Sequence, residues 1–333
     1  AIGRALASEL AELRCPLHVG TRVGLKKGGL LLAGLRAARV LRELRPDIVH
    51  LHTEIPEATY AVMVALRPGA ASAALVRTIH NSVYWHSWPR VGRWCERRLP
   101  ASHVACVSED ARAAYAGFRT QSSAGALPMP PRVIYNGIPP VSAAVRSPRA
   151  GSRLRLLFAG RLEPQKGADL LPEILNRVQP PAGKTCELVV HGSGSGAPLL
   201  HTLADHAPRG WTVTVHPPIA RLRQHLGEFD LGLGPSRFEG QGLIAVAALQ
   251  AGVPLVATDA LGLRECIPPD YPWRARAGQA AAFAAIVQRA LEHIATNPGL
   301  AEPIRRFANE RFSLHGMLNR YRELYAQALR PHG

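Results

Sequence analysis

The sequence has few aromatic residues, few cysteines and no apolar run long enough to cross a membrane. Aromatic side chains make up 6% of the 333 residues, and only five residues are cysteines. Their spacing excludes a zinc module or a paired redox motif, and we expect reduced thiols in a cytoplasmic protein. A membrane-spanning helix needs about 20 apolar residues, so we expect any membrane contact to be peripheral. The cysteines are Cys15, Cys95, Cys106, Cys186 and Cys266.

Acidic residues are the scarcer charged class. Asp and Glu number 24 against 40 Lys and Arg, which gives a formal net charge of +16. Such a balance favours phosphates, anionic lipid headgroups or nucleic acid as partners. The chain has no recognised nucleic-acid motif and no interleaving of aromatic and basic residues. A non-catalytic binder of nucleic acid or anionic membrane is therefore the weakest of the functions that we considered.

Helices and short apolar strands alternate along the first half of the chain. This alternation is typical of α/β domains with a parallel sheet. The opening residues 1–13 have small and apolar residues at helical spacing, without a strand or a cap before them, so we expect the true start of the domain to be missing. The predicted elements are a helix at 30–44, strands at 47–52, 74–80 and 103–108, and helices at 91–99 and 109–116.

A second alternating series follows a segment that is rich in Ser, Pro, Gly and Ala, at residues 120–151. That composition is typical of an interdomain connection, and a chain of 333 residues fits two domains. We expect domains at 1–145 and 146–313, with a final amphipathic helix, 314–333, that packs back on the first. The second series has predicted strands at 154–159, 186–191, 212–216, 230–234 and 254–258, and predicted helices at 168–178 and 243–250.

Two loops of the second domain leave predicted strands and enter helices, at residues 160–167 and 236–243. Ligands of open α/β sheets bind at such strand ends. A diphosphate in this position would meet the Arg161 guanidinium, the Lys166 ammonium and free backbone N–H groups at the start of the helix at Leu243. These groups favour a reaction whose leaving group is a nucleoside diphosphate, without a divalent metal. The sequence also has no Asp-rich metal motif.

The same residues belong to an ordered set of motifs that spans nearly the whole chain. The motifs are residues 46–52, 133–138 and 158–162 and the loop that contains Glu239. Together they resemble the retaining glycosyltransferases of family 4, also called glycosyl transferases group 1. That resemblance implies the GT-B architecture, in which two Rossmann-like, doubly wound domains face each other across a cleft.

The resemblance also implies roles for individual residues. Arg161 and Lys166 would bind the donor diphosphate, and Glu239 would contact hydroxyls of the transferred sugar. His80, after a strand of the first domain, would lie near that sugar and take part in catalysis with these three residues. The remaining donor-binding positions would be Gly160, His191, Gly192, Gly240, Gln241, Gly242 and Leu243.

The implied activity is hexosyl transfer with retention, from a nucleotide sugar to a hydroxyl of a glycan, lipid-linked or small-molecule acceptor. A UDP-sugar is favoured over a GDP-sugar, and neither a cofactor nor a metal is expected. We expect a bacterial enzyme of polysaccharide biosynthesis, cytoplasmic, with peripheral contact to the inner face of an anionic membrane and with no specific nucleic acid. The alternative within the fold is a nucleotide-sugar epimerase or hydrolase, which needs no acceptor.

The sequence departs from the family pattern at two positions. Ala247 stands eight residues after Glu239, where the family usually has a second glutamate that binds the ribose. The Asn-Gly turn at residues 136–137 usually continues to an acidic residue, but here Ile138 precedes Pro139.

Three further groups have a structural interpretation as well as a functional one. His50 and His52 alternate on one strand, but without a third ligand nearby we favour a structural role over a metal pair. The glycine-rich residues 191–196 lack the spacing and the helix opening of a dinucleotide fingerprint, and we expect a turn near the donor base. Tyr84, Trp85 and Trp88 either pack in the core or form part of an acceptor wall.

Overall fold

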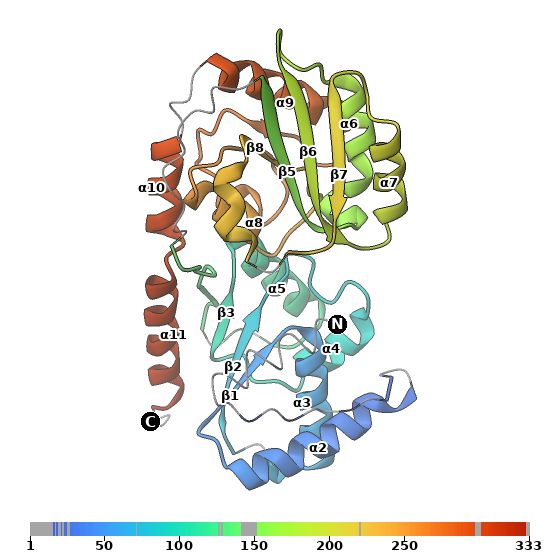
Figure 1. The fold of residues 1–333 in the computed structure, drawn as a ribbon. Coiled ribbons are helices and arrows are strands. Elements are labelled where there is room, and N and C mark those ends of the chain that lie inside the picture. The colour runs from blue at the N-terminus through green and yellow to red at the C-terminus, as the bar shows by residue number, and fades with distance from the viewer. Residues whose placement is uncertain are drawn as a thin grey trace.

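The computed structural model describes residues 27–70, 72–125, 127, 129–140, 152–219, 221–296 and 301–330, together with positions 16, 18, 21, 23 and 24. The chain forms two α/β lobes, each built on a parallel sheet (Figure 1). The predicted opening helix at 1–13, Cys15 and residues 126, 128 and 141–151 of the expected connection lie outside the described residues.

The first lobe has a four-stranded parallel sheet in the order β1-β2-β3-β4. Each strand predicted in this half is present, and so are the three predicted helices, which confirms the alternation. Helix α3 (Glu54–Leu66) was not predicted. The residue before it, Thr53, has a positive φ, and its side chain does not cap the helix. The elements are α2 (Gly29–Leu44), β1 (Ile48–His52), α3 (Glu54–Leu66), β2 (Ala74–Ile79), α4 (Pro89–Glu96), β3 (Val104–Cys106), α5 (Glu109–Gln121) and β4 (Arg132–Val133).

The second lobe has a six-stranded sheet in the order β10-β9-β8-β5-β6-β7, with all pairs parallel. Its strands are β5 (Arg153–Arg161), β6 (Thr185–Ser193), β7 (Trp211–His216), β8 (Leu231–Gly234), β9 (Leu255–Thr258) and β10 (Arg274–Ala275). Its helices are α6 (Leu171–Arg177), α7 (Ala197–Asp205), α8 (Leu243–Gln250), α9 (Ala280–Thr296) and α10 (Ala301–Arg311). Short 3-10 turns, η3 (Pro164–Lys166), η4 (Ala168–Leu170), η5 (Leu222–Glu228) and η6 (Arg264–Cys266), complete the lobe.

The strand order of the second lobe reverses at β5. The chain runs outward from β5 through β6 and β7, and then returns to the other side of β5 with β8. In open α/β sheets, ligands bind outside the carboxyl ends of the strands at such a switch point. The loops after β5 and β8 are the two that the sequence analysis selected, so the topology places both at the same edge of the sheet.

Two segments join the lobes. The chain passes from the first to the second after residue 140, and helix α11 (Leu314–Ala328) returns along the first lobe (Figure 1). Leu324 and Ala328 of α11 pack on Val76 and Ala105, on one face of the first sheet. No described helix is long and apolar enough to span a membrane.

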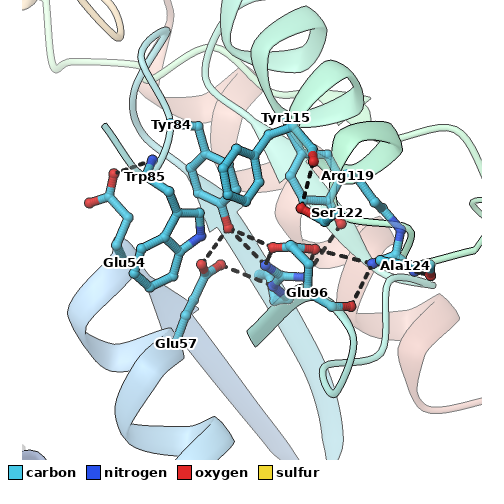
Figure 2. Close-up of polar contacts among 11 residues, drawn as sticks. Glu54, Glu57, Tyr84, Trp85, Glu96, Tyr115, Arg119, Ser122 and Ala124 are labelled. Carbon is cyan, nitrogen blue, oxygen red and sulfur yellow. Dashed lines mark hydrogen bonds and ion pairs between the residues drawn. The ribbon is translucent and has the colours of Figure 1, made fainter. Parts of the chain in front are cut away.

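The opposite face of the first sheet covers a buried ionic network (Figure 2). Arg77 of β2 is wholly buried and donates hydrogen bonds to Glu57 at 2.9 Å, Tyr84 at 2.9 Å and Glu96 at 2.5 Å. Burial raises the pKa of Glu57, while Arg77 opposes that shift. The network fixes α3, α4 and the loop between β2 and α4 against one strand, because each of them supplies a partner for the guanidinium.

Candidate active site at the edge of the second sheet

The centre of the site is an ion pair between the two selected loops. Lys166 Nζ lies 2.6 Å from Glu239 Oε1 and 2.7 Å from Oε2. The carboxylate also accepts a hydrogen bond of 2.8 Å from Ser236 Oγ. The Lys166 side chain is 21% exposed and that of Glu239 is 8% exposed. The structure thus brings together the cation and the carboxylate that the sequence analysis assigned to phosphate and sugar.

Close backbone packing holds the two loops together. Gly167, which ends η3, has φ +71, and a Cβ there would lie 2.1 Å from the carbonyl oxygen of Pro235. Arg237 donates its backbone N–H to the Gln165 carbonyl at 2.8 Å. A larger residue at position 167 would push the loops apart, so this glycine sets the spacing of the ion pair.

Arg161 is the last residue of β5 and is exposed to solvent. Its guanidinium donates a hydrogen bond to the side-chain carbonyl of Gln165, and the Gln165 amide donates to the carbonyl of Phe238 at 3.1 Å. Gly160, the residue before Arg161, pairs with Gly192 of the neighbouring strand β6 in the parallel register. Arg161 therefore lies at the same sheet edge as Lys166, with its guanidinium held over the loop by Gln165.

The start of α8 differs from the prediction of a free amide at Leu243. The Leu243 N–H donates to the Gln241 carbonyl at 2.9 Å, so it is already paired. Gly242 is the N-cap, and no side chain caps this helix. The Gln241 side chain bonds both backbone groups of Asn136, at 2.6 and 3.0 Å. Gln241 thus ties the second loop to the connection between the lobes, a contact that its sequence position did not indicate.

His191 belongs to β6, which is separated from β8 by β5 and pairs with β7 on its other side. Its ring stacks on that of His216, with centroids 5.1 Å apart, and its Nδ1 lies 3.3 Å from the carbonyl of Pro217. The glycine-rich residues after it open directly into α7, whose N-cap is Gly196. The expectation that no helix follows this segment was wrong, because α7 begins only four residues after the strand, with Pro198 in its first turn.

His80 of the first lobe faces the second loop. A Cβ at Gly240 would lie 1.7 Å from the His80 carbonyl oxygen, and Ser82 Oγ donates to the Glu239 carbonyl. The His80 Nε2 lies 2.8 Å from Nδ1 of His52. The fold therefore places His80 next to the Glu239 loop, although 159 positions separate the two residues in the sequence.

His80 lies beside His50 and His52. The third histidine that the sequence analysis did not find nearby is present, because β1 and β2 are neighbours in register. Burial lowers the pKa of His50 to about 3 and that of His80 to about 4, with the other histidines adding to both shifts. All the same, no group of three or more metal-ligating residues is found in the described part of the chain. His50 bonds Tyr325 and Thr78, each at 2.7 Å, and so ties α11 to the sheet.

The contact between the lobes contains charged residues that the sequence analysis did not select. Glu265 accepts the backbone N–H groups of Glu109 and Asp110, each at 2.8 Å, at the start of α5. Asp110 in turn pairs with Arg264 and accepts the Gly262 N–H at 2.8 Å. A carboxylate at a helix N-terminus is favourable, and only the folded chain shows that it comes from the other lobe.

Two questions left open by the sequence have structural answers. Ala247 is 2% exposed and packs with Leu157 and Phe229, so this face of α8 is part of the core. Tyr84 and Trp85 are buried, at 8% and 2%, whereas Trp88 is half-buried. The first two rings pack in the core, and Trp88, which packs against that core, also lines a surface pocket with Trp85.

Two parallel-sheet lobes that meet at the switch point of the second define the GT-B class of folds. The solved structures agree. HepE from Anabaena in complex with UDP and glucose superposes with a TM-score of 0.77, at 21% identity over 97% of this chain and 89% of that one. The sucrose-phosphate synthase of Thermosynechococcus elongatus gives a TM-score of 0.74, at 18% identity over 92% of this chain and 80% of that one. The expected fold is confirmed.

Family matches cover both lobes. Residues 153–293 match the family described as Glycosyl transferases group 1, and residues 4–141 match Glycosyltransferase Family 4. The chain belongs to this family of GT-B glycosyltransferases.

Curated relatives match parts of the chain. The D-inositol 3-phosphate glycosyltransferase of Xylanimonas cellulosilytica is 36% identical over 34% of this chain, and that of Kineococcus radiotolerans is 34% identical over 44%. The glycogen synthase of Mycobacterium tuberculosis is 26% identical over 72% of this chain and 58% of its own length. The chain spans 28% and 38% of the first two relatives.

Proposed function

We propose that this chain transfers a hexosyl group from a nucleoside diphosphate sugar, UDP-linked in preference to GDP-linked, to an acceptor hydroxyl with retention of configuration. The observation that supports it is the Lys166–Glu239 pair at the switch point, with Arg161 at the same edge. HepE, which shares the fold, binds UDP and glucose, and family membership favours the same donor class.

In this proposal the ion pair separates when the donor binds. The cavity lined by Lys166, Ser236 and Glu239 measures about 40 Å³, whereas small-molecule sites measure roughly 300–1,000 Å³. The Lys166 and Glu239 side chains must therefore separate to admit the diphosphate and the sugar. Lys166 then pairs with the diphosphate, and Glu239 accepts hydrogen bonds from the sugar hydroxyls.

Catalysis follows from these positions. The bond between the anomeric carbon and the diphosphate oxygen breaks, and the acceptor oxygen bonds to that carbon on the same face. The acceptor proton passes to the departing diphosphate, whose growing charge Lys166 and Arg161 stabilise. The lowered pKa of His80 keeps its ring neutral near pH 7, so it can bond a sugar hydroxyl. The proposed reaction uses neither a metal nor a cofactor.

Melting and product assays test the proposal. UDP should raise the melting temperature, because a ligand that binds only the folded protein at about 100 times its Kd adds about 2.7 kcal/mol. Incubation of UDP-glucose with and without an acceptor separates transfer from the alternatives. A freed or altered sugar without acceptor indicates a hydrolase or an epimerase, and an inverted anomeric linkage or loss of activity with EDTA contradicts the proposed mechanism.

We also propose that α2 rests on an anionic membrane surface. Leu31, Leu35 and Arg42 recur at helical spacing on this helix, and the two leucines are 49% and 41% exposed. A face that combines exposed leucine with arginine suits an interface of acyl chains and acidic headgroups. Vesicles with phosphatidylglycerol should bind the protein, and vesicles of phosphatidylcholine alone should not. Equal binding to both, or unchanged binding by the Leu31→Ser and Leu35→Ser double variant, contradicts this contact.

A further inference from the structure

The first lobe has a pocket that the donor chemistry does not use. It measures about 420 Å³ and lies at the carboxyl edge of the first sheet. This volume is in the range of sites for small molecules. Its walls come from the first turn of α3 and from the loop between β2 and α4, and they include Glu54, Ile55, Asn81, Trp85, Ser87 and Trp88.

Each of the two walls contains a backbone conformation that is unfavourable for its residue. Thr53, before α3, has φ 71, and Trp85 has φ 54. A positive φ is rare for β-branched and bulky residues and costs about 1–3 kcal/mol each. Such strain persists only where the surrounding structure holds the residue in place, and it is concentrated at functional sites.

The surrounding structure does hold Trp85. Its ring packs edge-on against Tyr84, with centroids 5.8 Å apart, and Tyr84 belongs to the buried ionic network. On the other side the ring meets α4 at Gly92, where a Cβ would lie 2.3 Å from Trp85 Cγ. Figure 2 shows Trp85 between Glu54 and this network. The network thus holds in place Trp85, one of the residues that line the pocket.

The lining has the chemistry of a saccharide site. The indole ring of the half-buried Trp88 offers an apolar face, against which the C–H face of a pyranose can stack. Among the described residues, Glu54 accepts a single long hydrogen bond of 3.4 Å, from the Trp85 backbone N–H, so its carboxylate has acceptor capacity for hydroxyl groups. The indole N–H of Trp85 is buried and has no hydrogen-bond partner in the described part of the chain.

The pocket adjoins the candidate active site. Asn81, which lines it, directly follows His80, and a Cβ at Gly240 would lie 3.3 Å from the Asn81 Cα. A ring held in the pocket would therefore lie on the first-lobe side of the Glu239 loop. We propose that this pocket binds a pyranose ring of a saccharide acceptor, by stacking on Trp88 and by hydrogen bonds to Glu54 and Asn81. The acceptor role rests on the proposed transferase function.

Fluorescence titrations with methyl glycosides test the pocket. The methyl α-glycosides of glucose, galactose and mannose serve as probes, with tryptophan emission as the signal. We expect saturable binding of at least one glycoside, weakened about tenfold in Trp88→Ala, which corresponds to about 1.4 kcal/mol. Glu54→Gln should weaken it in the same direction. Trp88→Phe, which keeps an aromatic face, should retain most of the affinity and guards against a misfolded variant.

Trp94→Ala is the matched control. Trp94 is also half-buried on α4, but it stacks on Arg98 at 4.4 Å and does not line the pocket. Saturable binding that Trp94→Ala keeps and Trp88→Ala loses supports the proposal. No binding of any of the three glycosides, or equal loss in both variants, overturns it.

The UDP-dependent rise in melting temperature separates this proposal from that of the donor site. If UDP stabilises Trp88→Ala as it does the unaltered chain while glycoside binding is lost, the two sites are independent. If glycosides bind but UDP has no effect, the transferase proposal fails and the saccharide pocket stands.

Discussion

Each lobe contains an ion pair next to its parallel sheet, and the two pairs differ in how far they are buried and in how many partners the cation has. Arg77 and Glu57 are fully buried, with side-chain exposures of 0%, and the guanidinium has four side-chain partners, Glu57, Tyr84, Glu96 and Tyr115. Lys166 and Glu239 lie at the open edge of the other sheet, and the described contacts of the ammonium are with that one carboxylate.

This difference separates a structural network from a reactive pair. Taking a charge out of water costs several kcal/mol, which the partners of Arg77 offset only while all remain in place. Such a network cannot exchange a partner for a ligand. The Lys166–Glu239 pair keeps contact with solvent and has a single carboxylate to release, so a diphosphate can replace it.

The largest expected effect concerns the buried ion pair of the first lobe, Arg77 with Glu57. Arg77→Met should lower the free energy of unfolding by about 3–5 kcal/mol, because it leaves the buried Glu57 carboxylate without its cation, whereas Glu96 keeps Arg119. Urea unfolding measures the change. Arg153→Met is the control: its side chain is 60% exposed and 3.9 Å from Glu187, so we expect a change of about 0.5 kcal/mol or less. Equal effects of the two substitutions would mean that burial does not distinguish them.

The next effect concerns the reactive pair. Lys166→Ala should lower turnover about a hundredfold or more, in line with the loss of one transition-state donor, while the melting temperature stays close to that of the unaltered chain. Steady-state kinetics with UDP-glucose measures it. Lys184→Ala, at the amino end of β6 in the same sheet, removes the same charge away from the site and should leave turnover unchanged. A turnover rate in Lys166→Ala equal to that of the unaltered chain would contradict the role of Lys166 at the donor diphosphate.

A smaller effect tests the contact between the lobes. Gly240→Ala would place a Cβ 1.7 Å from the His80 carbonyl oxygen, and relieving such an overlap costs about 1–3 kcal/mol. We expect a lower melting temperature together with reduced turnover. Gly117→Ala in α5 has no atom within 4 Å of its Cβ and should stabilise the chain by up to about 1 kcal/mol. If both variants behave alike, the lobes do not depend on this close approach.

The smallest expected effect is a pH dependence of stability. The pKa of His80 is lowered to about 4 by burial and by His52, below the value of about 6.5 for an unfolded histidine. Between these two values the unfolded chain binds more protons, so stability should fall as the pH falls from 6.5 to 4. Thermal melts of the His80→Gln variant should show a shallower pH dependence in this window. An unchanged slope would show that His80 is not the group that titrates.

The sequence located most of the strands, most of the helices and the two loops because each has a local signal. Apolar runs next to Gly and Pro mark β5 and β8, position relative to a strand end selected Lys166, and the resemblance to the glycosyltransferase family selected Glu239. Helix α3 was missed although Thr53 is a residue type that commonly caps helices; its side chain makes no cap bond in the structure. The place of His80 beside the other two histidines was missed because β1 and β2 are separated in sequence.

The sequence by itself determined the α/β alternation, the excess of positive charge and the residues at the carboxyl ends of the strands, because these depend on neighbours in the chain. Only the tertiary structure decided that Lys166 meets Glu239, that Gly240 rests on His80, and that Glu265 caps a helix of the other lobe. Such contacts join residues up to 160 positions apart. They depend on strand order and on packing between sheets, which no local pattern specifies.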